Sequence, residues 1–219
     1  MSENTTSTDT TATEENWAVE YDVEPIRIRD PVAEALTVLE PGEPFVVTYE
    51  DVIKAAGHSC PTASGAYRIT QIALDALYPE EYPVRSEIEV RAPEPRDDAT
   101  YGVMGRLISY VTGAAQEDGF GGLKSGYGDR TNLLRFDAFE SESAEPTFRF
   151  RRTDTDETVE VTYQVSDVPD GGPALRNLEE IIDGTANEED REFFAEAWHG
   201  RVRTVLSDDS LFTVTTVDR

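Results

Sequence analysis

The segment 61–78 constrains the fold more than any other, because its composition predicts a helix that is apolar on nearly every side. Its strongly polar members are Arg68, Gln71 and Asp75, which fall on one narrow stripe of a helical wheel. A helix this apolar has to be covered by other elements, so we predict that it is the central core helix. Its many small residues allow a neighbouring element to approach closely.

The rest of the chain mixes helical and extended patterns without a regular strand-helix-strand order. Two strands near 150 and 160 alternate well enough to form a hairpin. These features favour the α+β class, with mixed helices and a mainly antiparallel sheet, over a doubly wound α/β fold. The other expected helices are 30–39, 49–56, 101–111, 175–182 and 188–206. The expected strands are 23–29, 84–91, 133–139, 147–152, 159–165 and 211–217, and 45–48 is either a brief strand or a linker.

Composition divides the chain into three parts. Residues 1–16 are rich in Thr, Ser and acidic residues and have nothing to bury, so we predict a disordered tail. Residues 17–140 are expected to form the α+β core. Residues 141–219 are expected to form a strand-helix extension that packs on this core.

Charge restricts the partners and the setting. The chain has 45 acidic residues against 19 basic ones, a net charge of -26, which repels nucleic acids and anionic membranes. Lys54 and Lys124 are the only lysines, and the acidity is spread along the chain. This pattern favours a protein that works in high salt, where screening removes self-repulsion. Without a signal peptide or a long apolar run, we expect a soluble cytoplasmic protein.

The chemistry is concentrated in the connector from Gly57 to Pro61. His58 follows the end of one expected helix, and Cys60, the only cysteine, stands at the cap of the next, where the dipole and free N–H groups favour a thiolate. Residues two apart in an extended connector point the same way, so the ring and the sulfur can converge. They would then hold a transition metal, with zinc as the first candidate, or act as a thiolate–imidazole pair. The alternative is an inert thiol beside a histidine that caps carbonyls.

Four segments together carry a resemblance to a known family. The run Ala56-Gly57-His58-Ser59-Cys60-Pro61, followed by a small-residue helix, resembles the G-H-x-C-P signature of the FmdE family of formylmethanofuran dehydrogenase components. The segment 108–114 (ISYVTGA) is similar to that family's second helix with its Thr-Gly end. The segments 119–123 (GFGGL) and 132–137 (NLLRFD) resemble its glycine-rich loop and following strand.

The resemblance implies an α+β core, a homodimer, and a metal in the His-x-Cys cleft. The family takes its name from an accessory component of a molybdenum or tungsten enzyme, so a redox-enzyme partner is also implied. The sequence departs from the family at Ala114, where many members have a cysteine, and it lacks their C-terminal zinc finger of paired cysteines. His58 and Cys60 supply two ligands of the four that zinc usually takes. Thr112, Asp118, Asp129, a dimer partner or water would supply the others.

Three functions follow from this interpretation. The first is a metal-binding protein, with zinc or another divalent transition metal, that acts on a small molecule; His58 and Cys60 would be catalytic if it is an enzyme. The second is a non-catalytic assembly module for a redox or molybdenum enzyme, and the third is a thiol enzyme that uses Cys60. The loop 119–128 is expected beside the corner, and Lys124 of the loop and Arg130 and Asn132 just after it are candidates for binding an anionic cofactor. His199 is expected to be a surface histidine.

Overall fold

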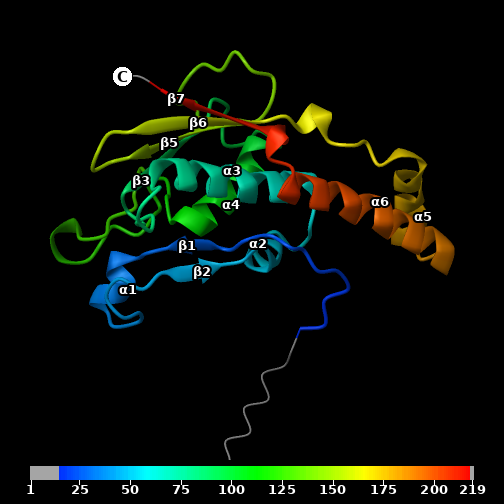
Figure 1. Cartoon of the computed structure of the whole chain (residues 1–219), viewed down its shortest axis with the longest axis horizontal. Helices are drawn as coiled ribbons and strands as arrows, with labels where there is room; N and C mark the ends of the chain where they lie inside the picture. Colours follow the sequence, from blue (N-terminus) through cyan, green and yellow to red (C-terminus); the bar gives the residue numbers. More distant parts are fainter. Residues whose placement is uncertain (1–14, 218–219) are drawn as a thin grey trace, which may run out of the picture.

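Helix α3 (Pro61–Leu77) runs through the middle of the protein, as Figure 1 shows. The structure is a computed structural model that describes residues 15–217. Helices α2 (Tyr49–Ala56), α4 (Tyr101–Thr112) and α6 (Glu188–Ser207) pack against α3, and so does a five-stranded sheet. The prediction of a central core helix at 61–78 is therefore confirmed.

The sheet is mainly antiparallel. The strands β3 and β4 are parallel, and every other neighbouring pair is antiparallel, which confirms the α+β class. Three strands that follow residue 141 pair in one sheet with two strands that precede it. The order is β4 (Leu134–Arg135), β3 (Ile88–Arg91), β5 (Thr147–Arg152), β6 (Thr158–Tyr163) and β7 (Phe212–Thr216).

A small second sheet lies on the other side of α3. Strands β1 (Ile26–Ile28) and β2 (Phe45–Val47) are antiparallel and are joined through α1 (Pro31–Ala35). Tyr67 of α3 anchors this sheet, since its hydroxyl donates to the carbonyl of Glu24 at 3.0 Å and lies 3.2 Å from that of Val47.

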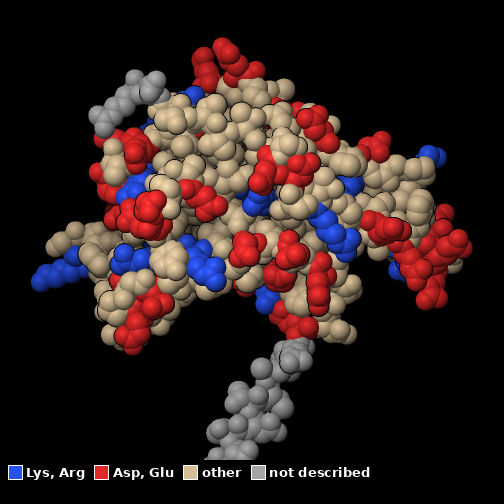
Figure 2. Space-filling view, viewed as in Figure 1, with Lys and Arg blue, Asp and Glu red and all other residues tan. Residues whose placement is uncertain are grey.

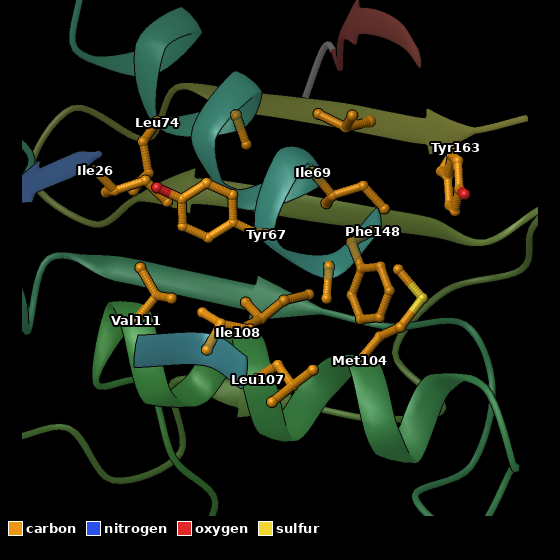
Figure 3. Close-up of a cluster of buried hydrophobic side chains, with 14 of the residues drawn as sticks. Ile26, Tyr67, Ile69, Leu74, Met104, Leu107, Ile108, Val111, Phe148 and Tyr163 are labelled. Carbon is orange, nitrogen blue, oxygen red and sulfur yellow. The ribbon is translucent and has the colours of Figure 1, made fainter. Parts of the chain in front are cut away.

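The core fills the space between α3, the large sheet and α4. Figure 3 shows side chains of α3, aromatic residues of the sheet and aliphatic residues of α4 gathered in one cluster, with Phe148 drawn between Ile69 and Met104. All are buried, so the apolar surface of α3 is removed from water on several sides at once. The residues labelled in that view include Tyr67, Ile69 and Leu74 of α3, Phe148 and Tyr163 of the sheet, and Met104, Leu107, Ile108 and Val111 of α4.

The helix ends follow local sequence signals. Thr48 and Asp51 form the expected capping box at the start of α2, and Gly57 ends it in the left-handed conformation with φ 77°. Cys60 caps α3, and Pro61 occupies its first turn. Gly113 ends α4 with φ 74°. The ends of α2 and α3 set the conformation of the connector that carries His58.

Several predicted ends are wrong, because single residues with positive φ interrupt the extended or helical backbone. The strand predicted at 84–91 begins only at Ile88, because Ser86 has a φ of 75° that is incompatible with an extended strand. Asn132 (φ 60°) and Asp137 (φ 52°) confine the strand predicted at 133–139 to two residues. Thr37 (φ 57°) stops the helix predicted at 30–39. The first half of the helix predicted at 175–182 is a 3₁₀ turn that leads into α5 (Leu178–Ile182).

Helix α6 extends well beyond α3, and α5 lies near its outer end (Figure 1). Figure 2 shows a dense group of acidic side chains at this end of the molecule. Within residues 15–217, none of the helices is both long and apolar enough to cross a membrane. The predicted disordered tail 1–16 lies almost wholly outside the described residues.

Candidate metal-binding corner and the adjoining cavity

His58 stands at the surface directly after the left-handed Gly57. Its Nδ1 lies 3.1 Å from the carbonyl oxygen of Ala56. In the tautomer that carries its proton on Nδ1, the ring donates to this carbonyl and leaves the lone pair of Nε2 free. Metal-binding histidines commonly use their second nitrogen in this way, so the local geometry of His58 suits a ligand.

Cys60 is half-buried at the N-cap of α3. Its Sγ accepts a hydrogen bond from the backbone N–H of Ala63 at 3.4 Å, as expected for a sulfur at a helix start. Burial raises the pKa of Tyr21, Tyr49 and Tyr163, and a charge on the neighbouring Cys60 adds to this rise. A negative charge on Cys60 would therefore disfavour ionisation of these three tyrosines.

The two candidate ligands lie in different surroundings. His58 lines a surface cavity that Cys60 does not line, whereas Cys60 packs against the hydrophobic core. The structure thus places both residues where the sequence predicts, one past a helix end and one at a helix cap. Their convergence on one ion stays a prediction.

Two aromatic side chains, Tyr49 of α2 and Trp198 of α6, form hydrogen bonds to Ser59. The hydroxyl of Tyr49 lies 2.9 Å from Ser59 Oγ, and Nε1 of Trp198 donates to the Ser59 carbonyl at 2.8 Å. Tyr21 is hydrogen-bonded to Nδ1 of His199 at 2.6 Å. Helix α6 therefore fixes the corner from outside, through contacts that sequence analysis missed.

The expectation that His199 is a surface histidine is wrong. The side chain is half-buried against Tyr21, at the point where α6 crosses the N-terminal segment. Burial lowers the pKa of His199, and the positive charge of Arg203 lowers it further. The two residues of this hydrogen bond are 178 positions apart, so no local pattern could have predicted it.

The further ligands proposed from the sequence lie in different surroundings. The hydroxyl of Thr112 is engaged at the end of α4, where it donates to the Ile108 carbonyl at 2.8 Å and accepts from the N–H of Ala114 at 3.2 Å. Hydrogen bonds from Thr131 lower the pKa of Asp129. Among residues 15–217, no group of three His, Cys, Asp or Glu side chains is placed to hold a metal ion.

The glycine-rich loop packs on the α1 end of the molecule. Arg130 forms an ion pair with the buried Asp30 at 2.6 Å and lies over the ring of Phe120. A side chain at Gly128 would overlap Val32 of α1. Lys124 and Asn132 are exposed. None of the three predicted anion-binding residues, Lys124, Arg130 and Asn132, lines the cavity beside His58.

The cavity beside His58 has a volume of about 660 Å³. Arg96 and Arg106 contribute positive charge to it, and Leu134 and Phe136 contribute an apolar wall. Asp118, one of the proposed ligands, also lines it. Sequence analysis missed both arginines, because nothing in the local pattern relates a loop at 96 and a helix at 106 to the connector at 58.

No protein-family model matches the sequence, and a search of curated proteins finds no match either. The resemblance to the FmdE family therefore rests on the motif residues alone.

Proposed function

We propose that this chain is a metal-binding protein in which His58 and Cys60 hold a divalent transition metal, most readily zinc, and that it acts on a small molecule. The observation that carries the proposal is the contact between His58 Nδ1 and the Ala56 carbonyl, which leaves Nε2 available. Cys60, at a helix cap with an N–H donor at its sulfur, supplies the second donor atom. A nitrogen and a thiolate sulfur are the ligands that zinc prefers.

Two protein ligands leave the coordination sphere open. We propose that water, a substrate group or a second copy of the chain completes it, in keeping with the homodimer that the resemblance implies. A zinc ion bound in this way would act as a Lewis acid and would lower the pKa of a bound water. The protein's part would be to position the ion at the mouth of the cavity through His58.

Elemental analysis of protein purified in high salt tests this proposal. The wild type is compared with His58→Gln and Cys60→Ser, and His199→Gln serves as the control for loss of a histidine. We expect near-stoichiometric metal in the wild type and in His199→Gln, and loss of metal in the other two variants. Metal-free wild type after incubation with zinc would contradict the proposal and would favour the interpretation of His58 and Cys60 as helix-end caps alone.

The acidic end formed by α5 and α6 favours a second candidate, the non-catalytic assembly module. Leu178, Ile182 and Phe193 are large apolar side chains that are exposed there, and Ile182 is 74% exposed. Exposed apolar side chains surrounded by charge are typical of protein contacts. This candidate predicts stable co-purification with a redox enzyme that is lost in Ile182→Ser with Phe193→Ser; unchanged co-purification of this variant would contradict it.

A further inference from the structure

We propose that the cavity beside His58 binds a small organic anion, a carboxylate or a phosphate monoester with an apolar body. The cavity lies between α4, the segment 96–99 and the turn 115–118. The inference names a ligand class for the site of the proposed function and shares His58 with it, but its anion contacts come from Arg96 and Arg106, which hold no metal.

The two arginines are set apart from most arginines of this chain by their lack of partners. The arginines of the large sheet all form ion pairs with carboxylates, as do Arg29, Arg85 and Arg130 around α1. Within residues 15–217, neither Arg96 nor Arg106 has a carboxylate within 4.0 Å or a side-chain hydrogen bond. In a chain of net charge -26, two guanidinium groups left unpaired at one cavity are available to an external anion.

The acidic residues at the cavity do not cancel this charge equally. The carboxylate of Asp98 is engaged at the start of α4, where it accepts hydrogen bonds from the backbone N–H groups of Thr100 and Tyr101, both at 2.8 Å. Asp118 is exposed and also lines the cavity, so its carboxylate offsets part of the positive charge of the two arginines. A bound ligand would therefore direct its anionic group toward the arginines and hydrogen-bond donors toward Asp118.

The apolar wall indicates a ligand larger than an inorganic ion. Phe136 and Leu134 form this wall, and Phe136 lies directly on Gly105 of α4, where an added methyl group would overlap its ring. Gly102, one turn earlier, allows the backbone of Arg96 to approach in the same way. The two glycines of α4 thus let the ring and the arginine-bearing segment close around the cavity. A volume of about 660 Å³ is in the range of small-molecule sites.

NMR titration of the full chain tests this inference, with the amide shifts of the protein as the readout. Phenyl phosphate and benzoate are the probes. Benzamide serves as the neutral analogue and inorganic phosphate as the probe without an apolar body. The double variant Arg96→Gln with Arg106→Gln is compared with Arg27→Gln, which removes an exposed arginine that lines a different cavity. Cys60→Ser removes a proposed metal ligand that does not line this cavity, so it reports on the metal separately.

We expect both organic anions to bind, with amide shifts at 102–106, and to bind at least tenfold more weakly to the double variant, while Arg27→Gln stays unchanged. Benzamide and inorganic phosphate should bind weakly. Equal affinity in the double variant, equal binding of benzamide, or shifts confined elsewhere would overturn the inference. Anion binding by metal-free Cys60→Ser would support the inference whether or not the proposed metal site exists. A wild type that holds metal but binds neither organic anion would overturn the inference and leave the proposed function standing.

Discussion

Glu89 of β3 is a buried carboxylate that pairs with several arginines of the large sheet. Glu89 is 2% exposed. Its carboxylate accepts hydrogen bonds from Arg91, at 3.0 Å, and from Arg151, and it lies 3.3 Å from the guanidinium of Arg135. Burial is the largest single effect and opposes the charged form of Glu89, but the hydrogen bonds from Arg91 and Arg151 and the charges of Arg91 and Arg135 together lower its pKa below the ordinary value of 4.5. The ionised form therefore stabilises the fold.

Replacing Glu89 with Gln should lower the free energy of unfolding by about 2 kcal/mol at neutral pH, because the three partly exposed arginines lose their shared partner. A lowered pKa gives stability that is present above pH 4.5 and is lost as the pH falls through the folded-state pKa. The variant should accordingly lose less stability than the wild type on acidification. Urea unfolding between neutral and acidic pH measures both effects.

Glu160→Gln provides the control on the same face of the sheet, because Glu160 pairs within the described residues with Arg149 alone, at 2.7 Å, and is more exposed. We expect it to cost less than about 1 kcal/mol. A Glu89→Gln variant that is as stable as this control and keeps the wild-type pH dependence would show that Glu89 does not stabilise the sheet in this way.

At the site, single residues were predictable where the signal is local. Helix ends depend on a few neighbouring residues, so the positions of His58 after Gly57 and of Cys60 before Pro61 followed from the sequence. The partners of this corner were not predictable, because Trp198 reaches Ser59 across 139 positions. Contacts of that range depend on how α6 packs against α3, which no local pattern encodes.

Among the elements, α3 depends on close approach to the sheet. Gly65 faces the ring of Tyr163, and a methyl group at Gly65 would overlap that ring. Gly65 and Tyr163 are both buried, so the ring has little room to move. The sequence predicted a small-residue helix that allows close approach, but it did not identify Tyr163 as the residue that approaches.

Gly65→Ala should therefore destabilise the protein by about 1–3 kcal/mol, despite the better helix propensity of alanine. Gly200→Ala is the matched control, since Gly200 also lies inside a helix but has nothing within 4 Å of an added methyl group. It should stabilise the protein by about 0.5–1 kcal/mol. Chemical denaturation of the two variants measures the difference, and equal stabilisation of both would contradict the packing of Tyr163 on α3.

The sequence predicted which segments are strands and which are helices better than it predicted their lengths. The hairpin of β5 and β6 follows from alternation, and the register pairs Phe148 with Val161 on the buried face. The shortness of β3 and β4 comes from non-glycine residues with positive φ, such as Ser86 and Asn132. Asn adopts positive φ more readily than most non-glycine residues, so the sequence gives some warning at Asn132 but little at Ser86.

For the molecule as a whole, the net charge of -26 is the dominant electrostatic property. Figure 2 shows acidic side chains across one face, densest at the end formed by α5 and α6. Ion pairs neutralise part of this charge on the sheet but leave the acidic helix end exposed. Repulsion between like charges therefore opposes folding in dilute buffer.

We predict that the melting temperature rises between about 0.1 M and about 1 M KCl, where the screening length falls from about 10 Å to about 3 Å. Each kcal/mol of repulsion removed should raise it by about 2–4 °C. A variant with Glu192→Gln and Glu196→Gln in α6 should gain less from salt than the wild type. A melting temperature that is flat or falls with salt would contradict the prediction of salt adaptation.

The proposed function requires that one metal ion takes ligands from both His58 and Cys60, and a cobalt(II) titration can detect both ligands in one spectrum. Cobalt bound by a thiolate gives a sulfur-to-metal charge-transfer band, and a nitrogen ligand changes the visible ligand-field bands. We predict a stoichiometric endpoint with both features, loss of the charge-transfer band in Cys60→Ser, weakened binding in His58→Gln, and competition by zinc. A spectrum of hydrated cobalt in the wild type, or a charge-transfer band whose titration is unaffected by His58→Gln, would contradict a shared metal site.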